Sequence, residues 1–186
     1  MVTNKSQLFM LTGERGVGKT TFCKALASHA RQNGWRVGGI ITPVIFAGNE
    51  KVGILAENLD SGETHPLASL AQNAPFDMSL GKWYFDRSVI DWGNQVIHDS
   101  LPCDLLIIDE YGPLELLRHE GWWTSVDVFN SHAYRAGLVV VRPELEALAR
   151  QALNTGETLF LGDARQTGQL VRDLWSEISS RNIAHG

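Results

Sequence analysis

A glycine-rich segment, Gly13 to Thr20, has the residue types and spacing to bind phosphate groups. Its sequence, "GERGVGKT", fits the pattern G-x-x-x-x-G-K-[ST], in which glycines let successive backbone N–H groups point at phosphate oxygens. We expect Lys19 to reach the β- and γ-phosphates and stabilise the transferred group, and the Thr20 hydroxyl to coordinate Mg²⁺. The predicted nucleotide-binding residues here are Gly13, Glu14, Arg15, Gly16, Val17, Gly18, Lys19, Thr20 and Thr21. The motif predicts a nucleoside triphosphate as ligand.

A second candidate cluster is the acidic pair Asp109 and Glu110, which ends the segment "DLLIIDE". The apolar run before the pair is typical of a buried strand, and ligands bind at the C-terminal ends of parallel strands. We expect Asp109 to hold Mg²⁺ through water, and Glu110 to accept a proton from a water that attacks the γ-phosphate. Two acids at a strand end can also be solvated surface groups. The phosphate-binding motif upstream favours the catalytic interpretation.

Arginines are the third kind of candidate, because a guanidinium that neutralises transition-state charge can raise a rate ~10³–10⁵-fold. Arg142 follows the apolar run "LVVV" at the ligand end of a predicted strand, and we predict that it is catalytic. Arg165, in "GDARQTG", follows the last predicted strand, where many proteins with this motif bind the base. Arg15 lies inside the glycine-rich segment, and Arg87 is a weaker candidate. The alternative for each is a solvated side chain.

Strands that alternate with helices must position these groups. The first part of the chain reads as a buried strand at 7–12, a helix at 19–33 and β-rich runs at 36–46, 52–59 and 64–70. Turn residues separate the β-rich runs, which predicts an antiparallel hairpin or meander inserted at about residues 36–71. The later elements are a short strand in "KWYF", a helix capped by Asp86 or Ser88 and running to about 100, a strand at 104–108, a helix at 124–136, a strand at 138–141, a helix at 143–154, a strand at 158–161 and a helix at 166–181. This order predicts an α/β fold with a mostly parallel sheet.

The bulk properties narrow the class of protein. The 186 residues, 44% of them hydrophobic, predict one globular domain spanning residues 1–186. A formal net charge of -5, without a basic run, argues against a nucleic-acid or anionic-membrane partner. Only two cysteines are present, and no signal peptide or membrane span is visible in the sequence. These features predict a cytoplasmic protein.

With both motifs in place, the chain resembles the THEP-type nucleoside-triphosphatases, a family of P-loop proteins. The resemblance is carried, in order, by "GERGVGKTT", "GGIITP", "GKWYFD" with "WGN", "LLIIDEYGPLEL" and "VVVRPEL". It implies a P-loop NTPase three-layer fold, with Mg²⁺-dependent hydrolysis of ATP, GTP and related triphosphates to diphosphate and phosphate. Asn94, in "DWGNQ", matches a family position, so we weigh a role at the site against a surface amide. The family often has charged hairpin residues where "VIF" stands at 44–46.

Two other functions use the same phosphate-binding loop. A small-molecule or nucleotide kinase would pass the γ-phosphate to an acceptor hydroxyl, which needs an acceptor pocket and usually an arginine-bearing lid. A nucleotide-dependent binding module would present a protein-partner surface at the hairpin Val44–Phe46 or at Trp122–Trp123. Two adjacent indoles cannot easily both be buried, so we expect one of this pair to be exposed.

Overall fold

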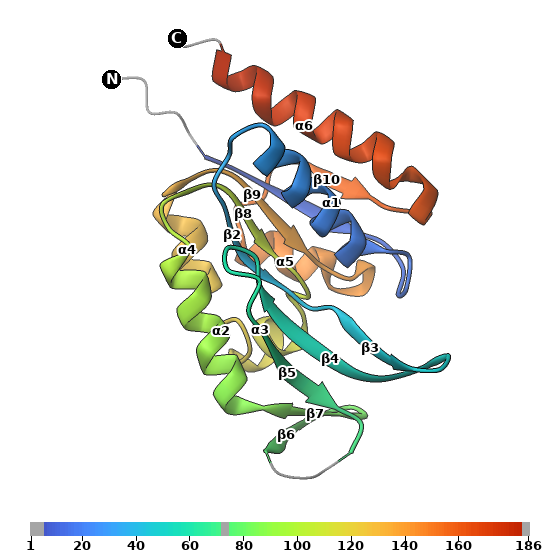
Figure 1. Ribbon diagram of the computed structural model, residues 1–186. Coiled ribbons are helices and arrows are strands. Elements are labelled where there is room, and N and C mark those ends of the chain that lie inside the picture. Colours follow the sequence, from blue (N-terminus) through green and yellow to red (C-terminus); the bar gives the residue numbers. More distant parts are fainter. Residues whose placement is uncertain (1–5, 72–74, 184–186) are drawn as a thin grey trace.

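The computed structural model describes residues 6–71 and 75–183, and within them the strands form one sheet (Figure 1). The strands are β1 (Gln7–Thr12), β2 (Val37–Ile41), β3 (Val44–Ala47), β4 (Glu50–Asn58), β5 (Thr64–Ser69), β6 (Phe76–Leu80), β7 (Trp83–Asp86), β8 (Cys103–Ile108), β9 (Tyr134–Val140) and β10 (Thr158–Phe160). Their order is β10-β1-β9-β8-β2-β4-β5-β7-β6, with β3 paired to β4. The strands from β10 to β2 are parallel, and the others continue the sheet in antiparallel fashion. The termini of the predicted domain, residues 1–5 and 184–186, lie outside the described residues.

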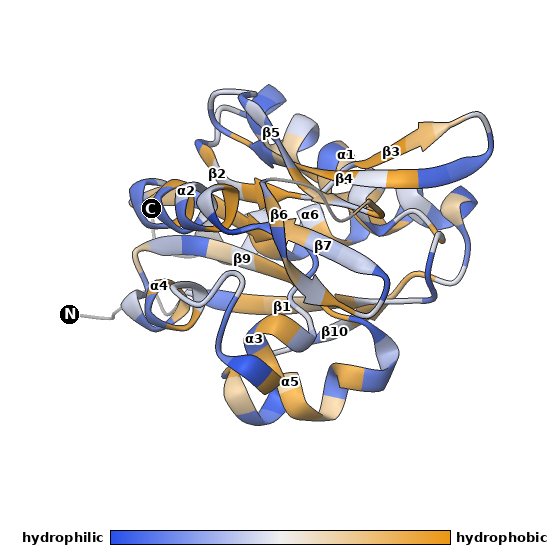
Figure 2. Ribbon diagram, turned by 90° about the horizontal axis from the view of Figure 1, so that it is seen from below, coloured by the Kyte–Doolittle hydropathy of each residue, from blue (hydrophilic) through white to orange (hydrophobic). Residues whose placement is uncertain are grey.

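Helices cover both faces of the parallel part of the sheet. They are α1 (Lys19–Gln32), α2 (Arg87–Asp99), α3 (Pro113–Arg118), α4 (Ser125–Ser131), α5 (Glu146–Ala152) and α6 (Thr167–Ile183). Alternate residues of β1 enter two separate cores, because successive strand side chains point to opposite faces. Phe9 and Leu11 pack with α1 and α6, whereas Leu8 and Met10 share a core with the other helices. Figure 1 shows α1 and α6 side by side, and Figure 2 shows hydrophobic residues along β1. The predicted three-layer α/β fold is confirmed.

Helix starts near the site follow local sequence signals. The helix α1 begins at Lys19, directly after Gly18, whose φ of 104° lies in the left-handed region that glycine tolerates. The helix α2 begins after Asp86, whose carboxylate accepts a hydrogen bond from the Ser88 N–H at 2.8 Å. This confirms the predicted cap. A short α3, which the sequence analysis did not predict, begins with Pro113 directly after Gly112.

Two predicted ranges differ from the structure. The helix predicted at 124–136 ends at Ser131, because His132 is left-handed with a φ of 53° and β9 already begins at Tyr134. The antiparallel part of the sheet also lies later than 36–71. Its first predicted segment includes β2, which pairs in parallel with β8, and its last strands are β6 and β7. The turn Gly81-Lys82 joins β6 to β7 as a hairpin.

Candidate active site

The glycine-rich loop lies between β1 and α1, at the C-terminal end of a parallel strand. Its lysine is buried: Lys19 Nζ donates hydrogen bonds to the carbonyl oxygens of Gly13 at 2.6 Å and Glu14 at 2.8 Å. Burial lowers the pKa of Lys19, and the nearby carboxylates of Glu110 and Asp109 oppose that change. At Gly13 a Cβ atom would lie 2.3 Å from the Leu161 carbonyl oxygen, so only glycine fits there. The backbone of the loop therefore folds around the Lys19 ammonium group, which bonds to two of its carbonyl oxygens.

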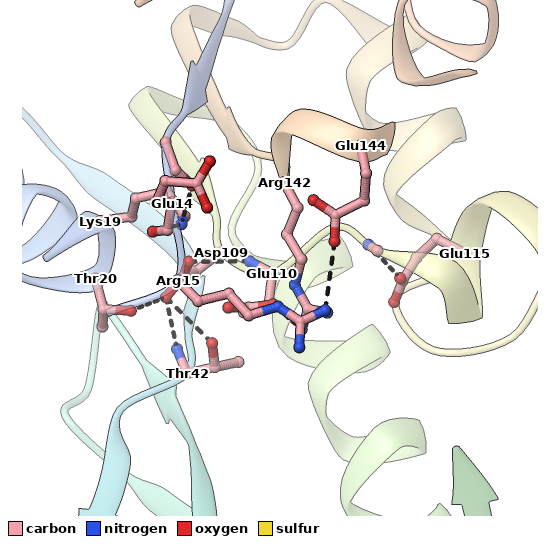
Figure 3. Close-up of polar contacts among 12 residues, drawn as sticks. Glu14, Arg15, Lys19, Thr20, Thr42, Asp109, Glu110, Glu115, Arg142 and Glu144 are labelled. Atoms are coloured by element: carbon pink, nitrogen blue, oxygen red, sulfur yellow. Dashed lines mark hydrogen bonds and ion pairs between the residues drawn. The ribbon is translucent and has the colours of Figure 1, made fainter. Parts of the chain in front are cut away.

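The Asp109 carboxylate joins the loop to the end of β8 (Figure 3). Asp109 Oδ2 accepts hydrogen bonds from the Thr20 hydroxyl at 2.7 Å, and from the Thr42 N–H at 3.2 Å and hydroxyl at 3.1 Å. Its Oδ1 accepts one from the Glu110 N–H at 2.9 Å. Burial and the neighbouring Glu110 charge raise the pKa of Asp109, while the bonds from Thr20 and Thr42 oppose that rise. The two predicted motifs thus meet at one carboxylate.

Thr42 received no role from the sequence analysis, although it lies in the quoted segment "GGIITP". It is buried and follows β2, the strand next to β8 in the sheet. The position of Thr42 after a strand and before a proline, at the same edge of a parallel sheet as Asp109, is the signal that could have identified it.

The residues around Asp109 match the donor set that Mg²⁺ uses beside phosphate. In such sites Mg²⁺ is bound through one or two carboxylates, a hydroxyl, waters and the phosphate oxygens. Thr20 Oγ1 and Asp109 Oδ2 are 2.7 Å apart, and both are hard oxygen ligands. No group of three or more His, Cys, Asp or Glu residues suited to a metal occurs in the described part of the chain. Thr20 and Asp109 are the residues that would hold a divalent cation here.

Glu110 lies beside Asp109, and the chain turns sharply at this residue. Its φ of 56° is left-handed, a conformation that is uncommon for a non-glycine residue and concentrates at functional sites. Glu110 Oε2 accepts a hydrogen bond from Arg142 at 3.0 Å, and both side chains are partly exposed. The predicted base and the predicted catalytic arginine are therefore in direct contact.

The other candidate arginines are more exposed. Arg15 pairs with Glu144 at 3.4 Å, close to Arg142 in the chain (Figure 3). Arg165 pairs with Asp163, its side chain 90% exposed, in the turn that follows β10. That turn contacts the loop, since a Cβ atom on Gly18 would lie 3.5 Å from Ala164 Cβ. Arg87 begins α2, which follows β7 near the end of the sheet opposite to β10. Its exposed side chain pairs with Asp77 at 3.9 Å.

Behind Glu110, a buried carboxylate organises the segment after β8. Glu115 Oε2 accepts a hydrogen bond from the Gly112 N–H and Oε1 one from the Trp122 N–H, each at 2.7 Å. Burial raises the pKa of Glu115 to about 7. The sequence signal was available: Gly112, Pro113 and a glutamate two residues later are typical of a helix start.

Asn94 is buried in α2, so it is not the surface amide that we weighed as an alternative. Its Nδ2 donates to the Ile90 and Gly121 carbonyl oxygens, and its Oδ1 accepts from the Thr124 N–H and hydroxyl. It therefore holds the segment that contains the tryptophan pair. Trp122 is buried and Trp123 is 55% exposed, as expected for adjacent indoles.

A cavity of about 370 Å³ lies beside Glu110, and its lining includes Arg15 of the glycine-rich loop. Glu110, Arg142, Arg15 and Thr42 form the part of its lining that adjoins the site just described. The remainder is mostly apolar and comes from β4, β5, β7, α2 and the region around α3.

A glycine-rich loop between a parallel strand and a helix, facing an acidic strand end, defines the class of P-loop nucleotide-binding α/β proteins. Residues 8–156 match the family model described as NTPase, and the chain belongs to that family. Among the described residues, no helix is long and apolar enough to cross a membrane.

Relatives and solved structures agree with this family. The nucleoside-triphosphatase THEP1 of Pyrococcus abyssi is 38% identical over 117 residues, which are 60% of this chain and only 62% of that relative. The THEP1 of Caldivirga maquilingensis is 31% identical over 152 residues, or 81% of this chain and 83% of the relative.

The solution structure of a human cancer-related nucleoside triphosphatase is similar with a TM-score of 0.69 at 20% identity, covering 94% of this chain and 98% of that one. THEP1 from Aquifex aeolicus gives a TM-score of 0.67 at 15% identity, with 92% of this chain and 99% of that chain covered. At these identities the structural likeness shows the fold alone.

Proposed function

We propose that this protein is a single-domain, Mg²⁺-dependent nucleoside-triphosphatase that hydrolyses ATP, GTP and related triphosphates to diphosphate and phosphate. The observation that carries the proposal is the 2.7 Å contact between the Thr20 hydroxyl of the loop and Asp109 at the end of β8. That contact brings a phosphate-binding loop and an acidic strand end to one point, as phosphoryl transfer requires. The family match and the printed activity of the THEP1 relatives support it.

Each residue has a role in this proposal. The backbone N–H groups from Gly13 to Thr21 and the Lys19 ammonium bind the phosphates and stabilise the negative charge that develops on the γ-phosphoryl group. Thr20 and Asp109 would hold Mg²⁺, Asp109 through water. When bound, the cation would neutralise negative charge on the phosphates.

Glu110 and Arg142 act on the attacking water and on the charge that follows. The Glu110 carboxylate accepts the proton of the water, and Arg142, which contacts it at 3.0 Å, orients that carboxylate and neutralises charge at the γ-phosphate. Arg165, in the turn after β10, would contact the base after leaving its ion pair with Asp163. Arg15, which lies in the loop but pairs with Glu144, remains a phosphate-binding prediction.

A phosphate-release screen with ATP, GTP, CTP and UTP, each with and without Mg²⁺, tests the proposal. We expect release that depends on Mg²⁺ and needs no second substrate. Phosphorylated product in place of free phosphate, when candidate hydroxyl acceptors are added, would instead identify a kinase. Partner capture at the exposed Phe46 or Trp123 that changes with a non-hydrolysable triphosphate would indicate a binding module.

A further inference from the structure

The cavity beside Glu110 has the size and lining of a small-molecule site. Its volume of about 370 Å³ falls in the range of ligand pockets, which are mostly apolar with a few polar groups. The apolar lining consists mainly of Ile54, Leu67, Phe85, Ile90, Leu114 and Trp122. They come from β4, β5, β7, α2 and α3 and from the segment between α3 and α4. The cavity therefore forms only when these separate elements pack together.

Two lysines in the cavity lining, Lys51 and Lys82, form no ion pair with a carboxylate in the described part of the chain, although the Glu110 charge acts on Lys51. Lys51 Nζ and Lys82 Nζ lie 5.2 and 5.8 Å from the centroid of the Trp83 ring, which also lines the cavity. Neither ammonium has a hydrogen bond or ion pair within residues 6–71 and 75–183. Lys51 is half-buried, and burial lowers its pKa. Two neighbouring cations over one indole favour an anionic ligand.

The two acids that line the cavity already have partners. Glu110 accepts from Arg142, and Glu115 accepts from two backbone N–H groups. Both Glu115 oxygens are therefore engaged, and Glu110 is held toward Arg142 through Oε2. The two arginines that line the cavity are also paired, Arg15 with Glu144 and Arg142 with Glu110.

A nucleotide that binds the loop as proposed would direct its base away from this cavity. The loop is flanked on one side by the turn after β10, through Gly18 and Ala164, and on the other side by Asp109. Because Lys19 and Thr20 take the β- and γ-phosphates, the γ end lies toward Asp109 and Glu110, and the base lies toward the turn after β10. The cavity starts at the γ-phosphate end, beyond Glu110.

We propose that the cavity binds a second ligand: a small molecule with a flat apolar body and one anionic group, such as a carboxylate, sulfonate or phosphate. The body packs against Leu67, Phe85 and Trp122, and the anionic group lies between Lys51 and Lys82. Its inner end adjoins Glu110, so the ligand lies next to the terminal phosphate of a bound nucleotide. Binding in this cavity does not depend on hydrolysis.

A pair of fluorescent probes tests both parts of the site. We would titrate the full chain with 8-anilinonaphthalene-1-sulfonate, which has a flat apolar body and one sulfonate, and with the uncharged N-phenyl-1-naphthylamine. Lys51→Met combined with Lys82→Met keeps most of each aliphatic stem and removes both charges. We expect this variant to weaken the sulfonate probe by about 10-fold or more, because bonds to charged groups are the strong ones. We expect the uncharged probe to bind as before.

Lys24→Met is the matched control, since Lys24 is a partly exposed lysine on α1 that pairs with Glu57 outside the cavity. It should leave both affinities unchanged. Ile54→Trp fills the cavity and should weaken both probes. A thermal melt shows whether each variant folds. If Ile54→Trp does not fold, the double lysine variant alone tests the proposal.

Saturating ADP with Mg²⁺ separates this site from the nucleotide site. We expect the affinity for the sulfonate probe to stay within about twofold, because ADP lacks the γ-phosphate and its base lies on the other side of the loop. Displacement of the probe by ADP would show that the cavity is the base pocket and would overturn the proposal. Equal binding of the sulfonate probe to the double lysine variant would also overturn it. Neither measurement uses turnover, so a failure to hydrolyse triphosphates is a separate result.

Discussion

The two regions that adjoin Glu110, the glycine-rich loop and the cavity, differ in how their polar groups are paired. On the loop side, the polar groups bond to one another: Lys19 to loop carbonyls, and Asp109 to Thr20 and Thr42. On the cavity side, the walls are apolar and two ammonium groups lack anionic partners among the described residues. The loop side is preorganised for one chemical group, whereas the cavity side is shaped for a molecule that the chain does not itself contain. Substitutions on the two sides should therefore affect different measurements.

The largest effect is expected from Lys19→Ala on the loop side. Removing the ammonium deletes its charge-assisted bonds to the β- and γ-phosphates, each worth ~1.5–3 kcal/mol, so affinity for ATP should fall by about 100-fold or more. Calorimetric titration with ATP and Mg²⁺ measures this. Lys24→Ala, five residues later in the same helix, is the control and should bind as the wild type does. Unchanged affinity for ATP in the Lys19 variant would show that the loop does not bind the nucleotide.

Glu110→Gln should separate binding from chemistry. The amide keeps a hydrogen-bond acceptor for Arg142 but cannot take a proton, so kcat should fall by ~10²–10⁴ while nucleotide affinity stays within about twofold. Single-turnover phosphate release, with a parallel binding titration, measures both quantities. Full turnover by this variant would rule out Glu110 as the base.

In the cavity wall, Glu115 should make stability depend on pH. Its pKa is about 7 in the folded protein and near 4.5 when unfolded, so the stabilisation is fully present below about 4.5 and is lost as the pH rises to 7. The free energy of unfolding should decrease by up to about 3 kcal/mol over that window. Urea unfolding at several pH values measures the slope. Glu115→Gln should flatten it, whereas Glu50→Gln, at an exposed position, should retain it.

A smaller loss of stability is expected from Asn94→Ala. The change leaves buried donors and acceptors around Gly121 and Thr124 without partners, at a cost of ~1–3 kcal/mol. Gln95→Ala is a matched control in the same helix, because Gln95 also bonds through its side chain but is exposed, and should cost less than ~0.5 kcal/mol. Equal losses in the two variants would mean that Asn94 does not hold the segment around the tryptophan pair.

The same contrast explains what the sequence could predict. The loop and the pair Asp109–Glu110 are contiguous motifs whose residue types follow from phosphate and metal chemistry, so their positions were predicted together with their elements. The cavity is assembled from separate segments, and no local pattern indicates that Lys51 meets the adjacent pair Lys82 and Trp83. Thr42 and Glu115 lay inside quoted motifs, but their partners are distant in the chain.

The errors in the predicted elements also have physical causes. The helix predicted at 124–136 extends over Tyr134 and Ala136, which are buried residues of β9. Only the left-handed His132 ends the helix, and histidine gives no strong signal for that conformation. The strand β6 was missed although Gly81-Lys82 is a two-residue hairpin turn.

The backbone conformation at Glu110 has a consequence for how the stability of this protein can be changed. A left-handed residue with a side chain costs ~1–2 kcal/mol relative to glycine, so Glu110→Gly should raise the melting temperature while removing the carboxylate. At this position, selection for heat resistance should therefore favour glycine, whereas selection for turnover should favour glutamate. A library screened only for thermal survival should accumulate glycine there and yield durable proteins that have lost their chemistry.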